Sequence, residues 1–565
     1  MLFWLGVTFV STMLLTPSIY FMKGKKSAGL VGWQAVKALV AVIAAWLLGY
    51  VAVLEHIFSA VFVYWTFVFL LLLYLDILVL KENRVQYKKS LASLIIAIAG
   101  YALLVSWIYL SFIYPWSITQ DLYQMVDAEE KLDRLEAINI EHIPSVPIES
   151  ARYKAEKLIG GIENSSYYRL GELTRQKIMQ EEYWVAPIEY KGFFESQKAG
   201  YIPGYIKVSA ERKDEIGEIV KGYTMRYIPS AYFDHNLERR VRSEFPTDII
   251  IGSGFEPNDE GKPIYVVAVG HYNKFRTGTV LDGAVLVDSE TGELRKYDLK
   301  DVPDFVDFVV TPNLASEYNE WQAKYKHGFW NYAFGKTDVN EVTKWNTGEE
   351  VIGVFGTDNR MYWFTDHTSP GTNSMKGYSL MDGRTGKFFM YVGSNGFANG
   401  KAALDAVHNT FKKEQWTGTN PLLYNIYSTD TWFVPVIDAN GMLRSIALVN
   451  AQNPQIVAAG QTRQEALNIY KLKLATEGSG DNTPTNISKR KEITGTVIRV
   501  GMNQMGESAT IQLLLSNSDR VFNVDPKSSI YATFIHEGDQ VTLSYVDTDE
   551  KSVSVENLYN ETLKK

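Results

Sequence analysis

Two residues of opposite charge stand inside long apolar stretches near the start of the chain. Lys37 lies early in an apolar run that covers about Val31–Leu54, and Asp76 lies late in the run Ile57–Leu80. A charged group in hydrocarbon is costly unless it is paired, so such residues form an ion pair, extend toward the headgroups, or belong to a proton or ion relay. If the two runs cross a bilayer in opposite directions, both residues reach a similar depth near one membrane face. This spacing favours a structural pair, and a relay is the alternative.

The rest of the sequence holds few residues whose spacing indicates catalysis or metal binding. The chain has no Cys, which excludes disulfides, thiolate catalysis and Cys-ligated metals. It contains no G-x-S-x-G elbow, no P-loop, no H-E-x-x-H motif and no dinucleotide fingerprint. His271 and His367 follow similar segments and would form a divided acid–base or metal pair, but loop positions facing solvent are the simpler interpretation. We therefore expect no catalytic residue, no metal ligand and no cofactor.

One aromatic cluster is a candidate interaction face. Its members are Tyr183, Trp184, Tyr190, Tyr201 and Tyr205. Aromatic side chains are enriched at the hot spots of protein interfaces, which favours a binding role. The core of a small sheet explains the same cluster equally well.

Four apolar stretches predict a membrane bundle in the first 116 residues. They cover about Leu2–Met22, Val31–Leu54, Ile57–Leu80 and Leu91–Trp116. Each is near or above the roughly 20 residues that a helix needs to cross about 30 Å of hydrocarbon. The first stretch lacks the basic n-region and the cleavage site of a signal peptide. The pattern predicts a four-helix transmembrane anchor.

The basic residues of this region predict its orientation. Lysines and arginines gather between the first and second stretches, in residues 23–30, and between the third and fourth, in residues 81–90. The positive-inside rule places both loops in the cytoplasm. The N-terminus and everything after Trp116 are then extracytoplasmic, in a multi-pass protein of the cell membrane.

The remainder of the chain is acidic. The whole protein has 565 residues with 64 acidic and 56 basic side chains, and 46% of its residues are hydrophobic. Residues 1–116 carry a net charge of +5, so residues 117–565 carry −13. A nucleic-acid binder needs clustered Lys and Arg, so we expect no nucleic-acid partner. The absence of Cys is compatible with the envelope of a Gram-positive type of cell.

A repeated hairpin organises the predicted extracytoplasmic region. Gly283–Tyr297 and Gly377–Tyr391 align without gaps at an offset of 94 residues, with six of fifteen positions identical. Each reads as strand, Asp-x-x-Thr-Gly turn and strand, in which Gly292 or Gly386 supplies the positive φ of the turn. A weaker copy at Trp432–Gly460 has its first turn at Asp438-Ala-Asn-Gly441, and Asn450-Ala-Gln-Asn-Pro454 stands in for its second turn.

These hairpins and the helical patterns between them predict small α+β units in series. The boundaries we expect are a stalk helix and linker at 117–147, with the helix over Asp121–Ile138, and units at 148–228, 229–320, 321–400 and 401–475. The third unit carries an aromatic insertion at Trp321–Trp345. Helices are expected at Glu149–Ile159, Asp214–Val220, Asn236–Phe245, Lys401–Lys412 and Thr462–Leu474.

The strand–turn–strand that contains Leu286-Val-Asp-Ser-Glu-Thr-Gly-Glu-Leu294, after a short helix, resembles the PepSY domain family. The resemblance covers mainly residues 236–297, with weaker copies at 377–391 and 432–460. It implies inhibitory, chaperoning or scaffold roles and supplies no catalytic residues. Hairpins with an Asp-x-x-Thr-Gly turn also arise outside that family, and the insertions between strands depart from its compact form.

The C-terminal part is expected to be a separate domain. Residues 476–491 are rich in Gly, Ser, Thr and Asn and predict a flexible linker. Residues 492–565 contain five short strand patterns separated by turn residues, which is typical of a small OB-like or SH3-like barrel. Its many acidic residues argue against oligonucleotide binding.

Taken together, these features favour a membrane-anchored protein of the cell envelope that binds other envelope proteins or supports an assembly. Its partners would be the lipid bilayer and envelope proteins, and a homo-oligomer is compatible with the sequence. The first alternative is a cell-wall hydrolase, or a regulator of one, with two carboxylates about 5–10 Å apart contributed by separate units. The second alternative is a component of a transport or secretion assembly.

Overall fold

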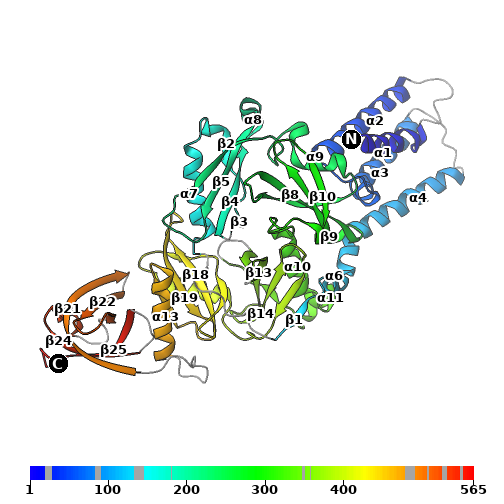
Figure 1. Ribbon diagram of the computed structural model, residues 1–565. Coiled ribbons are helices and arrows are strands. Elements are labelled where there is room, and N and C mark those ends of the chain that lie inside the picture. The colour runs from blue at the N-terminus through cyan, green and yellow to red at the C-terminus, as the bar shows by residue number, and fades with distance from the viewer. Residues whose placement is uncertain are drawn as a thin grey trace.

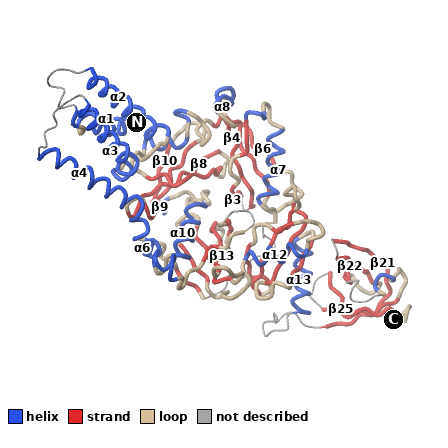
Figure 2. The backbone as a smooth tube through the Cα atoms, turned by 180° about the vertical axis from the view of Figure 1, so that it is seen from behind, coloured by secondary structure: helices blue, strands red, loops and turns tan. Residues whose placement is uncertain are grey.

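The computed structural model describes residues 1–18, 28–82, 91–132, 145–179, 181–345, 350–356, 358–477, 490–505, 508–524, 531–546 and 552–564. The chain has three parts, which follow one another in sequence and in space (Figure 1). A helical bundle lies at one end, a β-rich body covering residues 145–477 lies in the middle, and a small β domain lies at the other end. The view from behind shows the same order (Figure 2).

The bundle contains four apolar helices, of which three are long enough to cross a membrane. They are α1 (Leu2–Leu14), α2 (Ala28–Trp46) continued by η2 (Leu47–Val51), α3 (Phe58–Glu82), and α4 (Leu91–Ile108) continued by η3 (Tyr109–Ile113) and α5 (Tyr114–Ser117). The stretches with sufficient length and hydropathy are Gly29–Val51, Phe58–Lys81 and Ala97–Ser117.

The first of the four expected spans is shorter than the sequence pattern predicts. Helix α1 has 13 residues, which is about 20 Å at about 1.5 Å per residue, against about 30 Å of hydrocarbon. Pro17 accounts for its end, because a proline disfavours the helical conformation of the residue before it. The described residues therefore contain three helices of spanning length and one short apolar helix. Residues 19–27 and 83–90, which hold most of the basic loop residues, lie outside the described part.

The body consists of four antiparallel units, each preceded by a helix. Unit 1 comprises α7 (Ile148–Gly160), β2 (Tyr168–Leu170), β3 (Thr174–Ile178), β4 (Glu181–Tyr190), α8 (Phe193–Ala199), β5 (Ile202–Ser209) and β6 (Glu218–Met225). Unit 2 comprises α9 (Leu237–Glu244), β7 (Ile249–Pro257), β8 (Pro263–Lys274), β9 (Thr277–Asp288) and β10 (Leu294–Asp298). In both units the long strands pair in chain order, as β4–β5–β6 and β7–β8–β9–β10.

Units 3 and 4 follow the same plan. Unit 3 comprises α10 (Pro312–Lys324), α11 (Gly328–Trp330), η8 (Asn331–Gly335), β11 (Glu341–Val342), β12 (Ile352–Phe355), β13 (Met361–Thr368), β14 (Met375–Asp382) and β15 (Phe388–Tyr391). Unit 4 comprises α12 (Gly400–Thr410), β16 (Thr417–Gly418), β17 (Leu422–Ile426), β18 (Thr429–Ile437), β19 (Leu443–Asn450), β20 (Val457–Gly460) and α13 (Arg463–Glu477). Helix α10 crosses the expected boundary at residue 320 and packs with β13, so this unit begins before Pro312.

In three of the units, the same kind of polar turn follows the third long strand. The carboxylate or amide oxygen of Asp288, Asp382 or Asn450 accepts hydrogen bonds from the two backbone N–H groups two and three residues ahead, at 2.8–3.1 Å. In unit 1 the hydroxyl of Ser209 takes this role, at 3.3 and 3.0 Å. Short polar side chains stabilise turns in this way.

The glycines of the repeated turns have left-handed backbone conformations. Gly292 and Gly386 follow the capping aspartates with φ of 72° and 74°, as their turn requires. Gly441, with φ of 78°, belongs to the preceding turn, between β18 and β19. The third copy therefore matches the other two through Asn450 rather than through Gly441.

Two of the expected helices are replaced by shorter helices or strands. The stalk helix expected over Asp121–Ile138 is present only as α6 (Thr119–Met125), and β1 (Glu129–Lys131) then pairs in parallel with β15. Asp127 has a φ of 46°, which ends the helical path. Residues 133–144 are outside the described part. The helix expected at Asp214–Val220 is wrong, because Glu218 begins β6.

The hydrophobic cores join the units in pairs. One core contains residues of units 1 and 2, and another contains residues of units 3 and 4. The C-terminal domain has its own core. Its strands are β21 (Arg490–Met505), β22 (Ser508–Leu515), β23 (Val521–Val524), β24 (Gln540–Val546) and β25 (Ser552–Asn560). They pair in the cyclic order β21–β22–β23–β25–β24 and back to β21, with β23 and β25 parallel. Most of the expected linker, residues 478–489, lies outside the described part.

Candidate functional site

The structure brings Lys37 and Asp76 together as a buried ion pair between α2 and α3. Lys37 Nζ lies 2.9 Å from Asp76 Oδ1, and both side chains are fully buried. The ammonium also donates to Thr16 Oγ1 at 2.6 Å and to Ser18 Oγ at 2.9 Å. The carboxylate accepts from the backbone N–H of Ser18 at 2.8 Å and from Trp33 Nε1 at 2.7 Å. The ammonium donors and both carboxylate oxygens therefore have partners.

The polar groups along α1 are bonded to the backbone of the bundle. The hydroxyls of Thr8, Thr12 and Thr16 donate to the carbonyl oxygens four residues earlier, at 2.9, 2.7 and 2.6 Å. All three side chains are fully buried. This network ties the chain at the end of α1 to α2 and α3, which is what a structural pair does.

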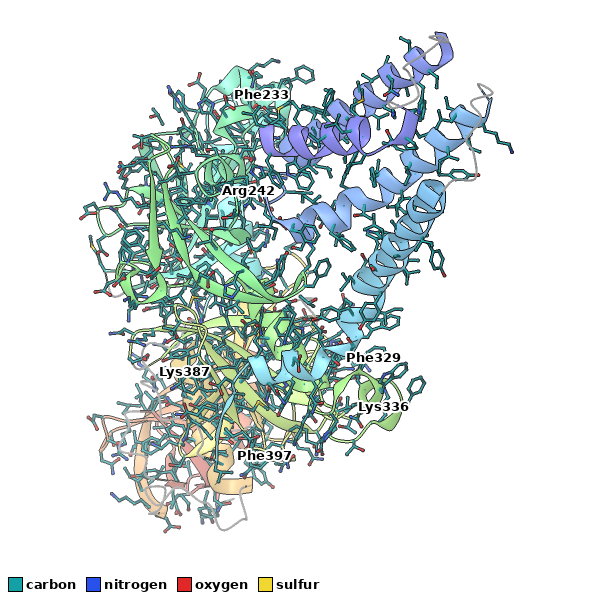
Figure 3. All side chains as sticks on the ribbon, turned by 90° about the vertical axis from the view of Figure 1, so that its right-hand side faces the viewer. Phe233, Arg242, Phe329, Lys336, Lys387 and Phe397 are labelled. Atoms are coloured by element: carbon teal, nitrogen blue, oxygen red, sulfur yellow. The ribbon has the colours of Figure 1, made fainter. Side chains whose placement is uncertain are left out.

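A short loop between α2 and α3 fastens the bundle to unit 2. Arg242 of α9 is buried and donates from Nε to the carbonyl oxygen of Val53 at 3.2 Å. Arg239 donates from Nε to the carbonyl oxygen of Tyr50 at 2.8 Å, and its guanidinium lies 4.3 Å from the ring centroid of Tyr50. Arginine suits this link between α9 and the bundle, because its planar guanidinium group can donate to several carbonyl oxygens and stack on aromatic rings. The label of Arg242 in Figure 3 marks this junction.

Further contacts fix the same junction. Arg276 of the β8–β9 turn pairs with Glu55, and its guanidinium lies 4.9 Å from the ring centroid of Tyr64. At the end of the last candidate span, Ala97–Ser117, the ring of Trp116 stacks on Phe329 with centroids 5.2 Å apart. The bundle is therefore attached to units 2 and 3 at separate points.

The expected aromatic interaction face is mostly core. Tyr183, Trp184, Tyr190 and Tyr205 are 2–9% exposed, and Tyr201 is 43% exposed. Trp184 Nε1 donates to the carbonyl oxygen of Val146 at 2.8 Å, so its polar end is also satisfied inside unit 1. The four buried side chains belong to the core of the sheet, which is the alternative interpretation of the cluster.

The two histidines considered as a divided site lie in different surroundings. His271 is exposed and 2.9 Å from Asp282. His367 is buried on β13, with Nε2 3.0 Å from Asn319 Oδ1, while Nδ1 has no hydrogen-bond partner. Burial lowers the pKa of His367 to about 4, so its imidazole is neutral at physiological pH. The solvent-facing interpretation is wrong for His367, and the two residues form no pair. Among the described residues no group of three or more His, Asp or Glu could hold a metal ion.

A buried carboxyl group, Glu256, and a half-buried one, Asp307, meet where units 1, 2 and 3 come together. Glu256 of β7 accepts the backbone N–H of Asp307 at 2.7 Å, and Asp307 accepts the backbone N–H of Lys177 at 2.7 Å. Burial, together with the charge of Asp307, raises the pKa of Glu256 well above its usual range. Burial likewise raises the pKa of Asp307 to about 7. Both carboxyl groups accept hydrogen bonds from backbone N–H groups of neighbouring segments, and these bonds link the units.

An aromatic pocket lies between units 3 and 4. Its volume is about 280 Å³. The pocket is lined by Lys131, Val354, Phe355, Gly356, Asp358, Tyr362, Phe364, Leu380, Phe389, Tyr391, Leu422, Leu423 and Tyr424. Pockets of this kind, mostly apolar with a few polar groups and set between domains, are common ligand sites.

The register of the unit 3 sheet shows how the floor of the pocket is built. Val354 is opposite Tyr362, and Leu380 is opposite both Phe364 and Phe389. Directly paired residues of a sheet point to the same side, so these five form one continuous face. Leu422, Leu423 and Tyr424 of β17 in unit 4 also line the pocket.

Polar groups stand at two sides of the pocket. Lys131 of β1 has its Nζ 4.8 Å from the ring centroid of Phe389, and it lies 3.5 Å from Glu129. Tyr362 donates its hydroxyl proton to Asp358 at 2.7 Å. Burial and this bond to Asp358 raise the pKa of Tyr362, so it remains a neutral donor. The pocket thus offers an apolar floor between a cation and a carboxylate.

Sequence reasoning missed this pocket because its parts come from segments far apart in the chain. Alternating aromatic residues in Met361–Thr368 and Phe388–Tyr391 were visible as strand patterns. Nothing in the sequence indicated that β1 would join their sheet or that unit 4 would leave part of the face open.

The comparisons with known proteins assign no family. No family model matches the chain, and no curated protein matches it. One similar solved structure is described as a sialidase, with 8% sequence identity and a TM-score of 0.17. The match covers 77% of this chain and 48% of the sialidase chain, so this chain spans about half of that structure. At this TM-score the likeness carries no argument about fold or activity.

Proposed function

We propose that this protein is a membrane-anchored, extracytoplasmic protein of the cell envelope that binds other envelope proteins. In this proposal the helices of the bundle hold the body at the bilayer, and the pocket between units 3 and 4 receives an apolar or aromatic group of a partner. The protein has no catalysis of its own. The PepSY resemblance, with its inhibitory, chaperoning or scaffold roles, is compatible with this proposal.

The pocket is the observation that carries the proposal. Interface hot spots place an aromatic or aliphatic anchor in a desolvated pocket surrounded by polar groups. The floor of Val354, Tyr362 and Phe389 offers such a cavity, and Lys131 and Asp358 supply opposite charges at its sides. Opposite charges of this kind select and orient a partner.

The hydrolase alternative has less support from the same geometry. A glycosidase needs two carboxylates about 5–10 Å apart in an accessible cleft. Among the residues that line the pocket, Asp358 is the carboxylate, and it already accepts the hydroxyl of Tyr362. Glu256 and Asp307 are a close pair, but Glu256 is 1% exposed and its oxygens accept backbone N–H groups.

The transport alternative rests on the network of Lys37 and Asp76. A relay requires a proton or ion to move through a polar path. Of the two hydroxyls that contact Lys37, Thr16 donates to the carbonyl oxygen of Thr12 and Ser18 donates to Asp76, which favours a fixed link.

Filling the pocket tests the proposed binding. A photo-crosslinking residue at Phe389 is expected to capture envelope proteins in intact cells, and the substitution Val354→Trp in the same chain is expected to abolish the capture. The matched controls are a crosslinker at Ile216, which is 75% exposed outside the pocket, and the substitution Ile216→Trp. Equal capture at both positions, unaffected by Val354→Trp, would contradict a binding role for the pocket.

Cysteine labelling tests the proposed orientation, because the chain has no native Cys. Lys412 and Lys81 are both exposed, one in the body and one at the end of α3. A membrane-impermeant maleimide added to intact cells should label Lys412→Cys and spare Lys81→Cys. The reverse pattern would place the body in the cytoplasm.

We also infer that the C-terminal domain is OB-like rather than SH3-like. The order β21–β22–β23–β25–β24, with β23 and β25 parallel, supports this choice, because an OB fold pairs its third and fifth strands in parallel. Arg499 lies 3.3 Å from Glu537, so one of its few cations is already paired. Oligonucleotide binding is not part of the proposal.

A further inference from the structure

Two exposed aromatic patches of the body lie beside the ends of the membrane helices. Patch A consists of Phe193 and Phe194 of α8 with Tyr232 and Phe233. The ring centroid of Phe193 lies 5.1–5.8 Å from those of the other three residues, and Phe194 is 73% exposed. Rings in contact with one another and with solvent form a cohesive apolar surface.

Patch B belongs to the aromatic insertion of unit 3. It consists of Phe329 and Trp330 of α11 and Phe334 of η8. Trp330 and Phe334 are 68% and 77% exposed, and their rings stack with centroids 5.9 Å apart. Lys336, also exposed, lies two residues after Phe334.

These patches contain the most exposed Phe and Trp side chains of the body. In the described part of residues 145–477, every Phe or Trp that is more than about a third exposed belongs to patch A or patch B, namely Phe193, Phe194, Phe233, Trp330 and Phe334. Large exposed apolar patches mark surfaces that are covered in the working protein.

Each patch is tied to the end of a different membrane helix. Arg239 donates to the carbonyl oxygen of Phe233 in patch A at 3.2 Å and to that of Tyr50, at the end of the span Gly29–Val51, at 2.8 Å. Phe329 of patch B stacks on Trp116, at the end of the span Ala97–Ser117. Figure 3 shows Phe233 and Phe329 on the side of the body from which the helices leave, one on each side of the bundle.

We propose that patches A and B rest in the interfacial layer of the bilayer that the helices cross, so that the body lies on the membrane surface. Aromatic rings concentrate at the headgroup level of membrane proteins, where their apolar faces meet the acyl boundary and their edges meet water. The contacts through Tyr50 and Trp116 bring both patches to the depth at which two spans end. Lys336 beside patch B adds a cation that attracts lipid phosphate.

The proposal rests on the spanning helices and is independent of the pocket. Its test uses the full-length chain in nanodiscs of phosphatidylcholine and phosphatidylglycerol. Spin labels are attached to Phe194→Cys and Phe334→Cys, with Ile216→Cys as the exposed control, and their accessibilities to oxygen and to a water-soluble nickel complex are compared. The two patch labels should show an oxygen-to-nickel ratio several-fold higher than the control, as expected for labels at the bilayer interface.

Two results would overturn the proposal. Patch labels as accessible to nickel as the Ile216→Cys label would leave both patches in water. Dipolar broadening between labels on different copies, lost on dilution with unlabelled protein, would assign the patches to a second copy of the chain instead. Ring removal by Phe194→Ser with Trp330→Ser is a second test, because this variant should lower the ratio at Phe334→Cys while leaving the melting temperature near that of the singly labelled chain.

Discussion

At the residue scale, the bundle is held together by a charge pair that has little freedom to move. Lys37 and Asp76 share Ser18 as a common partner and exclude solvent. A buried pair of this kind contributes specificity more than net stability, because desolvation offsets much of the attraction. Removing one member, in contrast, leaves the other charge buried and unpaired.

A double-mutant cycle measures this asymmetry. Lys37→Met and Asp76→Leu should each lower the free energy of unfolding by about 3–5 kcal/mol, and the double variant should recover most of the loss. The midpoint of thermal unfolding in detergent reports these effects. If both single variants were as stable as wild type but an ion flux disappeared, the pair would be a relay.

The half-buried carboxyl of Asp307 predicts a pH dependence of stability. Its folded-state pKa of about 7 lies above the unfolded value, so the native state holds a proton that the unfolded chain releases. The free energy of unfolding should therefore fall as pH rises from about 4 to about 7. Glu256, whose pKa is also raised, acts in the same direction.

Melting temperatures of the full chain between pH 5 and pH 8 test this expectation. Asp307→Asn keeps an oxygen that accepts the N–H of Lys177 and should flatten the decline. Asp304→Asn, at a fully exposed carboxylate nearby, should leave the decline unchanged. A wild-type melting temperature that rises through this range would contradict the assignment.

At the element scale, the repeated turn can be tested with two glycines of equal backbone conformation. Gly292 and Gly371 both have φ of 72°, but a Cβ at Gly292 would lie 2.5 Å from the ring of Tyr227, whereas nothing lies within 4 Å at Gly371. Both Ala variants should lose about 1 kcal/mol to the left-handed conformation. Gly292→Ala should lose about 1–3 kcal/mol more through overpacking. Equal losses in chemical denaturation would show that the ring moves aside.

The sequence predicted elements well where their signals were local. The helix expected at Asn236–Phe245 matches α9 closely, with Asn236 as its cap, because capping residues and periodicity act within one turn. The hairpins at Gly292 and Gly386 match for the same reason. The helix expected up to Ile138 was wrong, because the pairing of β1 with β15 joins residues that are far apart in the chain.

The candidate sites divide in the same way: features that depend on local signals were predicted, and features that depend on contacts between distant segments were not. Pairing of Lys37 with Asp76 was foreseeable from charge and depth alone. The burial of Tyr183 and Trp184 was left undecided, since a strand of aromatics serves a core or a surface equally well. The pocket and the two patches depend on which faces the units leave open, and that information is absent from any single segment.

At the scale of the whole molecule, shared cores determine which parts can fold alone. Residues 490–565 have a separate core, so this fragment should give a dispersed NMR spectrum and a cooperative melting transition. Unit 4 shares its core with Trp345, Phe364 and Tyr378 of unit 3. Residues 400–477 alone should therefore aggregate. A folded 400–477 fragment would contradict this division.

The attachment of the body at several separate points has a geometric consequence. A body joined to a membrane helix by one flexible stalk samples many heights and tilts. Here Tyr50, Val53 and Trp116 fix units 2 and 3 to the bundle, and a shared core holds unit 4 against unit 3. The pocket beside Phe389 is therefore held at a fixed height and orientation relative to the helical bundle. Under the proposed binding role, a partner tethered in the same membrane can engage the pocket only if its own reach matches that height.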